Sequence, residues 1–354
     1  MCTTVIAPAS AGFLMGHNYD FAFGHGMALV NRRGLHKISL HDHPAQAVEW
    51  TSGFGSLTLN QFAAELPVSG LNEAGLALAL MWHEEGEFPS HDDRPSLNEL
   101  QWIQYQLDSR GSVAEVLDHL GDIRIRPEMF ALHYALCDAA GDVAFIDFLE
   151  GRPQVVRNPD IAVLTNSSHE RSLAYAAQKG RTPASARLRT EDSLGRYLLA
   201  LRLAGGLHPA RTTAGDLFDL LHAVSLQASF RSIGDWVLRR RPPTFTQWTS
   251  VFDVGARRIH IQSRGARGTS ACALSGLDLD GGHAPMAADL PQAGDGGAPI
   301  EFRPFTVEDN RRLVEASFLP VGDRFPVELR QALAQYPWTF DGPDSPAECK
   351  PRIL

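Results

Sequence analysis

The chain opens with Met1-Cys2-Thr3-Thr4-Val5-Ile6, followed by Gly16-His17-Asn18-Tyr19-Asp20-Phe21, and these two stretches decide its fold. The β-branched run from Thr3 predicts a strand that holds the N-terminus inside the fold. Removal of Met1 would leave Cys2 with both a thiol and a free α-amine. Reference pKa values of about 8.5 and about 8 let these two groups exchange a proton near neutral pH. Cys2 is therefore either a nucleophile with its own base or an ordinary residue before an edge strand.

Composition restricts the class of protein. The 354 residues are 44% hydrophobic and 21% charged, which is typical of a globular protein with one large domain or two. The net charge of -9 argues against a nucleic-acid or anionic-membrane partner. Cysteines at 2, 137, 272 and 349 form no CxxC pair, so neither a metal site nor a disulfide framework is predicted. Without a signal peptide or a long apolar run, we expect a cytoplasmic protein with no membrane partner.

The order of expected elements indicates an α+β protein. Strands extend to Gly75–Trp82, and helices follow at two apparent capping boxes, Ser96-Leu97-Asn98-Glu99 and Ser112-Val113-Ala114-Glu115. The later expected elements are strands at 130–138, 143–149 and 161–165, helices at 172–203 and 213–224, and strands at 248–253 and 258–262. Grouped strands and helices favour antiparallel sheets with helices on their outer faces over alternating βαβ units.

The C-terminal part differs in composition. Residues 276–300 are dense in Gly, Ala, Asp and Pro, which predicts an irregular linker or surface loop. Residues 306–318 and 326–335 have the spacing of short amphipathic helices. We expect a catalytic domain over residues 1–275 and a helical extension over 301–354, packed on that domain.

Several short motifs occur in a consistent order over residues 2 to about 264. They are Cys2-Thr3-Thr4, Gly16-His17-Asn18-Tyr19-Asp20, Gly70-Leu71-Asn72-Glu73-Ala74-Gly75-Leu76, Leu132-His133-Tyr134 with Asp138 and Gly141, Leu164-Thr165-Asn166-Ser167, and Thr246-Gln247-Trp248-Thr249-Ser250-Val251. Together they resemble the choloylglycine hydrolase and penicillin V acylase family of linear amide C–N hydrolases, in the N-terminal nucleophile hydrolase superfamily. The resemblance implies a four-layer αββα sandwich, no cofactor and no metal, and a homo-oligomer, either a tetramer or a dimer.

The resemblance also implies roles for single residues. The amine of Cys2 would relay the proton, and Asp20 would hydrogen-bond at the nucleophile. The Asn166 side-chain amide and the backbone N–H of Trp82 would bind the oxyanion. Arg231, in Ser229-Phe230-Arg231-Ser232, is the candidate for a further active-site arginine.

The residue types give each role a physical basis and an alternative. Attack on an amide develops negative charge on oxygen, for which the Asn166 amide is a suitable donor, although an Asn after a strand also caps turns. An ammonium beside Asp20 would favour its charged form, although an Asp at a strand end is commonly a turn residue. His17 stands where the family has arginine. Because His titrates near 6.5, we expect either a steep pH dependence of activity or a purely structural His17.

Other polar clusters have simpler interpretations. His41-Asp42-His43 and His83-Glu84-Glu85 are interpreted as solvated loops and His133 as a core histidine. The predicted function is hydrolysis of a small N-acyl amide through an acyl-thioester on Cys2. An acyltransferase using the same thioester and a catalytically silent acyl-binding relative are the alternatives. The candidate loops contain four apolar residues, Phe21, Phe23, Met81 and Trp82. These residues favour a substrate with an apolar acyl group.

Overall fold

The β-branched N-terminal run forms a central strand in the computed structural model, which describes residues 2–10, 12–40, 44–179, 192–227, 244–282, 284–295, 297–318 and 325–340. This run is β1 (Thr3–Ala9), which pairs in antiparallel fashion with β2 (Gly12–Phe21) on one side and β14 (Ala162–Leu164) on the other. Pairing on both sides fixes the position of the N-terminus. The predicted strand that holds the N-terminus inside the fold is confirmed.

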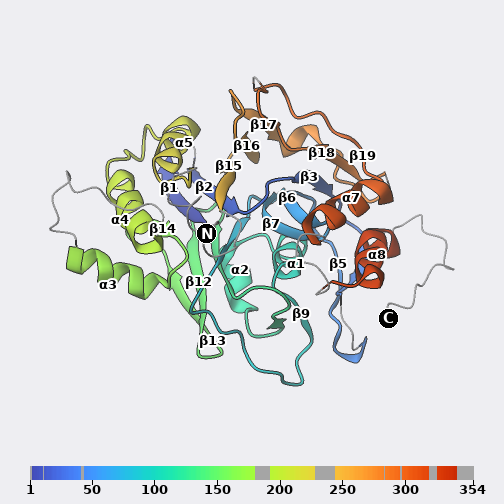
Figure 1. The fold of residues 1–354 in the computed structure, drawn as a ribbon. Helices are drawn as coiled ribbons and strands as arrows, with labels where there is room; N and C mark the ends of the chain where they lie inside the picture. The colour runs from blue at the N-terminus through green and yellow to red at the C-terminus, as the bar shows by residue number, and fades with distance from the viewer. Residues whose placement is uncertain are drawn as a thin grey trace, which may run out of the picture.

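Two antiparallel sheets make up the body of the protein (Figure 1). The six-stranded sheet has the order β14, β1, β2, β15 (Phe245–Asp253), β16 (Arg258–Ser263) and β17 (Ser270–Ala273). The nine-stranded sheet has the order β13 (Arg152–Arg157), β12 (Val143–Leu149), β11 (Leu132–Cys137), β8 (Ala77–Trp82), β7 (Leu66–Asn72), β6 (Ser56–Ala63), β3 (Met27–Asn31), β18 (Met286–Asp289) and β19 (Arg303–Pro304). Smaller pairs are formed by β4 (His36–Ile38) with β5 (Glu49–Thr51), and by β9 (Ser96–Asn98) with β10 (Arg124–Arg126).

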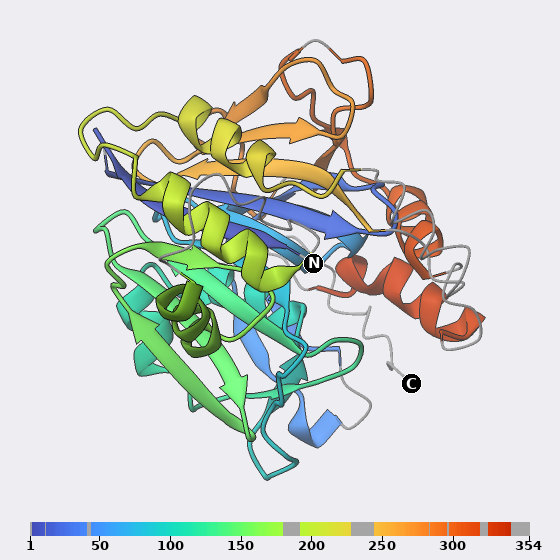
Figure 2. The same cartoon turned by 60° about the vertical axis from the view of Figure 1, so that its left-hand side comes forward.

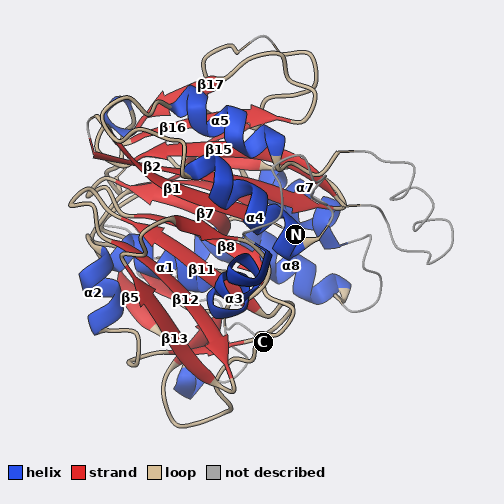
Figure 3. Cartoon of the chain, turned by 90° about the vertical axis from the view of Figure 1, so that its left-hand side faces the viewer, coloured by secondary structure: helices blue, strands red, loops and turns tan. Residues whose placement is uncertain are grey.

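Helices cover the outer face of the six-stranded sheet (Figures 2 and 3). They are α4 (Ser193–Ala204) and α5 (Ala214–Ala223), and α3 (His169–Lys179) packs against α4. Alternation along β1 sends Val5 toward these helices and Ile6 into the core between the sheets. A side chain at Gly16 would meet Leu221 of α5 at 2.6 Å, so glycine lets this helix approach β2 closely.

On the other side, α1 (Gln101–Ser109) packs against β7 and is followed by α2 (Val113–Asp118). The Asn-Glu-Ala-Gly motif forms the turn between β7 and β8 and attaches it to α1. Asn72 accepts from the backbone of Gly75 and Leu76 and donates to the carbonyls of Leu107 and Arg110. Gly75 has φ +98°, a conformation that favours glycine. The α+β architecture with two antiparallel sheets between helices is confirmed.

Several local predictions differ from the structure. Residues 96–98 form β9, and α1 begins only at Gln101, because Asn98 accepts from the backbone of Leu100 and Gln101 and so forms the turn itself. The helix expected over 172–203 is described as α3 and α4, and residues 180–191 lie outside the described residues. The stretch 276–300, expected to be irregular, contains β18, which pairs with β3. The C-terminal helices are confirmed as α7 (Val307–Phe318) and α8 (Val327–Gln335).

Candidate active site

Strand pairing brings Cys2 and Asn166 together. Cys2 precedes β1, and Asn166 follows β14 by two residues, with Thr4 opposite Leu164 in the register. The backbone nitrogen of Cys2 donates to Asn166 Oδ1 at 2.8 Å. Cys2 is 3% exposed, so its nitrogen and thiol are held in a largely desolvated position. The position of the candidate nucleophile thus follows directly from the central strand.

Asn166 connects the two sheets at this point. Its Nδ2 donates to the Trp82 carbonyl at 2.7 Å, and Trp82 is the last residue of β8. Its backbone nitrogen donates to Ser193 Oγ at 3.0 Å, at the start of α4. The contact is with the Trp82 carbonyl, while the oxyanion role of the Trp82 N–H stays a prediction. Because an amide NH₂ has two donors, Asn166 can hold Trp82 and still donate to an oxyanion.

Arg196 on α4 is a site residue that the sequence analysis did not find. It is 0% exposed, and its guanidinium donates to Asn166 Oδ1 at 2.6 Å and to Thr3 Oγ1 at 3.3 Å. Both Cys2 and Asp20 act electrostatically on this guanidinium. The predicted arginine, Arg231, lies outside the described residues. A permanent cation therefore lies beside the candidate nucleophile and comes from a helix that the sequence analysis treated only as structural.

Asp20 lies near the end of β2, opposite Thr246 of β15, whose hydroxyl donates to the carboxylate at 2.5 Å. Burial raises the pKa of Asp20 to about 6, although the amino terminus, Arg196 and Thr246 lower it. Burial also raises the pKa of the Cys2 thiol, opposed by the amino terminus, by a hydrogen bond from the Asp20 backbone and by Arg196. Ionised Asp20 would act in the same direction as burial on the thiol. Asp20 thus changes charge close to neutral pH, next to Cys2.

His17 lies opposite Thr4 in the β1–β2 register and faces the core between the sheets. It is fully buried, with Nδ1 at 2.9 Å from Thr4 Oγ1, and that hydroxyl lies 3.2 Å from the sulfur of Met81. Burial, with a contribution from the amino terminus, lowers the pKa of His17 to about 3. The expectation that this ring titrates near 6.5 is therefore wrong. Met81 is also a buried core residue and not part of a loop.

A second polar cluster lies behind Asn166. His133 Nε2 is 2.6 Å from the Thr165 carbonyl, and its Nδ1 is 2.6 Å from Asp147 Oδ1. Although burial opposes it, the hydrogen bond with His133 lowers the pKa of Asp147. His83, expected in a solvated loop, is buried and stacks on His133 with ring centroids 4.5 Å apart. Burial lowers the pKa of His83 to about 4.

This second cluster is a candidate for metal ligation by composition only. Nitrogen and carboxylate atoms of His83, His133 and Asp147 lie within 4.8 Å of one another. The two rings are nearly parallel, at 9°, so their in-plane lone pairs do not converge on one point as tetrahedral ligation requires. Both nitrogens of His133 already have partners. The arrangement instead holds Thr165, the residue before Asn166.

The chain is similar to proteins of known family. A sequence model of the linear amide C–N hydrolases of the choloylglycine hydrolase family matches residues 2–205. A penicillin V acylase of Pectobacterium atrosepticum is 29% identical over 137 residues, which cover 34% of this chain and 36% of that protein. The chain thus matches about a third of the length of that relative. The protein belongs to the choloylglycine hydrolase family of linear amide C–N hydrolases.

Solved structures show the same fold. Penicillin V acylase from Agrobacterium tumefaciens aligns with a TM-score of 0.71 at 21% identity, covering 86% of this chain and 99% of that chain. A mutant of the conjugated bile acid hydrolase from Clostridium perfringens aligns with a TM-score of 0.67 at 15% identity, covering 86% and 97%. These likenesses establish the N-terminal nucleophile hydrolase fold. Among the described residues, no helix combines the length and the apolar character needed to cross a membrane.

Proposed function

We propose that the protein hydrolyses a linear amide bond of a small N-acyl compound through an acyl-thioester on Cys2, after removal of Met1. The hydrogen bond from the Cys2 nitrogen to Asn166 Oδ1, at 2.8 Å, is the observation that carries this proposal. Once Met1 is removed, the same nitrogen becomes an α-amine that already has an acceptor. Catalysis is assigned to residues 1–275.

The proposed reaction uses groups at the ends of three strands, β1, β14 and β8. The thiol proton of Cys2 passes to the α-amine, and the sulfur attacks the amide carbonyl carbon. Asn166 Nδ2 and the Trp82 N–H are proposed to stabilise the oxyanion. The C–N bond then breaks as the ammonium returns its proton to the leaving amine. Water attacks the thioester, releases the carboxylic acid and regenerates the thiol.

Charge near Cys2 supports this proton transfer. A carboxylate at Asp20 would hold the ammonium form of the amine, and Arg196 offsets the negative charge that accumulates on sulfur and carboxylate. With Asp20 titrating at about 6, this arrangement forms as the pH rises toward neutrality. The activity is therefore expected to increase with pH on the acidic side, with Asp20 as the titrating group.

The surroundings of Cys2 support an apolar acyl group. Trp82 is 44% exposed, and the half-buried rings of Phe21 and Phe23 lie 4.9 Å apart by their centroids. The names of the relatives, penicillin V acylase and conjugated bile acid hydrolase, also support an N-acyl amide substrate. A cytoplasmic homo-oligomer is part of the same proposal, and size-exclusion chromatography with light scattering tests the assembly.

A panel of N-acyl amides, assayed with wild type and Cys2→Ser, tests the proposal. Wild type is expected to release acid from at least one amide, and Cys2→Ser to lose that activity by at least about a hundredfold. Equal activity of the two proteins would contradict the role of Cys2. Activity of neither protein on any amide would favour the silent acyl-binding relative.

A further inference from the structure

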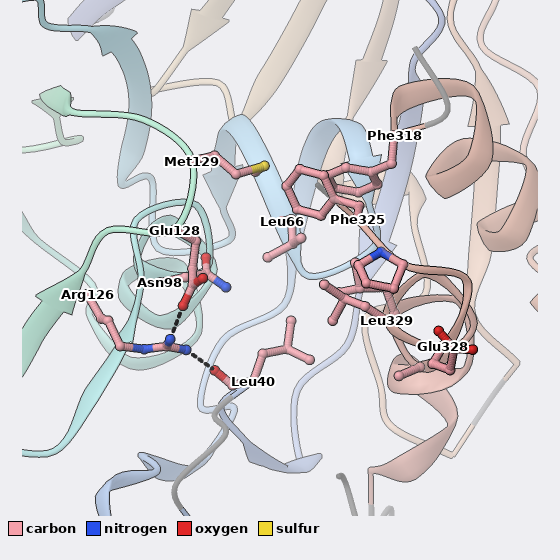
Figure 4. Close-up of a pocket in the computed structure, with 13 residues that line it drawn as sticks. Leu40, Leu66, Asn98, Arg126, Glu128, Met129, Phe318, Phe325, Glu328 and Leu329 are labelled. Carbon is pink, nitrogen blue, oxygen red and sulfur yellow. Dashed lines mark hydrogen bonds and ion pairs between the residues drawn. The ribbon is translucent and has the colours of Figure 1, made fainter. Parts of the chain in front are cut away.

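A cavity of about 490 Å³ lies between the catalytic body and the two C-terminal helices (Figure 4). Leu66 and Met129 line it from the body, and Phe318, Phe325 and Leu329 line it from the C-terminal part. Its size is that of sites that hold small organic ligands. The family match ends at residue 205, so one wall of this cavity is built by residues beyond that match.

Polar groups line this cavity mainly on the side of the body, at Asn98, Arg126 and Glu128, and Glu328 lies on the side of the C-terminal helices. Figure 4 shows Arg126 paired with Glu128 and donating to the Leu40 carbonyl, the latter at 3.3 Å. These contacts hold the Arg126 guanidinium at one side of the cavity. The remaining wall is mostly aliphatic and aromatic, which suits a hydrocarbon group better than a charged one.

A row of aromatic rings connects the cavity to the active site. Phe21 follows Asp20 directly, and its ring lies 5.7 Å from that of Phe62. Phe62 in turn lies 5.8 Å from Phe318, which lines the cavity. Phe130 packs against both, at 6.3 Å from Phe21 and 5.9 Å from Phe62. The apolar contacts therefore continue from the strand beside Cys2 to the cavity wall.

We propose that this cavity binds the distal part of a long aliphatic acyl chain while the scissile carbonyl lies at Cys2. The inference rests on the proposed amidase function and adds its substrate class, an N-acyl amide with a long unbranched chain. A short acyl group would end at the half-buried rings of Phe21 and Phe130, whereas a longer chain would continue along them past Met129 and bury its end against Phe318 and Leu329. Selectivity for chain length is thus assigned to the C-terminal helices.

A series of N-acyl anilides from butanoyl to tetradecanoyl tests this selectivity in wild type. Each newly buried methylene is expected to raise kcat/KM by up to roughly fourfold until the cavity is filled. Leu329→Trp, on the half-exposed rim of the cavity, is expected to lower the dodecanoyl-to-butanoyl ratio of kcat/KM by about tenfold or more. Leu173→Trp, at a similarly exposed position on α3, is the matched control and leaves the ratio unchanged.

Binding without turnover separates this proposal from the amidase function. An environment-sensitive fluorescent fatty acid is titrated into Cys2→Ser and displaced with dodecanoate. Dodecanoate should displace the probe about tenfold less effectively from Cys2→Ser/Leu329→Trp than from Cys2→Ser. That result supports the proposed role of the cavity even if wild type hydrolyses no anilide and the amidase function fails. An active wild type with a flat chain-length profile, or a Leu329→Trp ratio equal to that of wild type, overturns the cavity proposal and leaves the amidase function intact.

Discussion

Lys37 and Arg196 are both buried cations, and the pKa of each depends on burial, which lowers it, and on nearby negative groups, which raise it. A different one of these two effects prevails in each residue. Burial alone would lower the pKa of Lys37, but Asp108 and Glu65 raise it above its ordinary value. Burial does lower the pKa of Arg196, although Asp20 and Cys2 oppose this. The two sites thus combine the same charge types with opposite net results.

The surroundings of the two cations also differ. Lys37 Nζ reaches both carboxylate oxygens of Glu65, at 2.9 and 2.8 Å, and Asp108 Oδ2 at 2.9 Å. Asp108 is held in turn by Trp50 and Gln104. Arg196 donates to the oxygens of Asn166 and Thr3, and Asp20 and Cys2 act on its charge. A cation paired with two structural carboxylates stabilises the fold, whereas a cation that acts on the candidate nucleophile is suited to catalysis.

Removing Lys37 should have the largest effect, and it should fall on stability. Lys37→Met leaves Glu65 and Asp108 buried without their cation, so the free energy of unfolding should fall by about 3–5 kcal/mol. Urea denaturation measures this change. The activity per folded molecule should stay unchanged, and a selective loss of activity would show that this cluster also serves catalysis.

Removing Arg196 should instead reduce activity. Arg196→Met should lower kcat/KM by about a hundred- to a thousandfold, because the positive charge next to Cys2 and Asn166 is lost. Steady-state kinetics measure this loss, with circular dichroism to confirm folding. Arg258→Met, at the exposed first residue of β16, is the control and should retain wild-type kcat/KM. Equal kinetics of Arg196→Met and wild type would remove Arg196 from the site.

Asp20→Asn should lower activity and raise stability. With a native pKa of about 6 and a reference value of 3.8, the native state binds a proton that the unfolded state has released between these pH values. Wild-type stability from this group is therefore present below about pH 4 and is lost as the pH rises through about 6. The free energy of unfolding of the variant, relative to that of wild type, should rise by about 1–3 kcal/mol from pH 4.5 to pH 7.5. Urea denaturation at the two pH values measures this change. The same difference at both pH values would contradict the raised pKa.

His17→Gln should have the smallest effect on the pH profile. A ring with a pKa of about 3 is neutral wherever the enzyme is expected to work. The midpoint of the acidic limb of kcat/KM should move by less than about 0.5 pH units, since Asp20 and not His17 sets it. A larger shift in this midpoint would restore the titrating role of His17.

Local sequence patterns predicted the strands that pair with a strand next to them in the sequence. The strand β1, paired with its neighbour β2, follows from the β-branched run, and the helix expected over 213–224 is α5, which begins at a capping box of Thr213 and Asp216. The strand β18 was missed because Gly and Pro dominate its stretch and its partner, β3, is distant in sequence. Residues 96–98 have the composition of a cap but pair with β10.

The closeness of two candidate site residues was predictable because motifs contain them. Cys2 and Asn166 lie together as their motifs suggested, whereas Arg196 belongs to a Leu- and Ala-rich helix without a motif. One signal was present, since helical spacing places Arg196 on the same stripe as Ala200, one turn further along α4. An arginine on an apolar stripe needs a buried partner. The lowered pKa of His17 depends on tertiary burial, which no local pattern contains.

Quenched mass spectrometry of the protein during turnover tests the central role of Cys2 most directly. Wild type mixed with an N-acyl anilide and quenched in acid should lack Met1 and carry one acyl group on its N-terminal peptide, sensitive to hydroxylamine as a thioester. Cys137, whose thiol is buried with a raised pKa, should remain unmodified and is the internal control. An active enzyme that retains Met1, or that carries its acyl group elsewhere, would contradict the account.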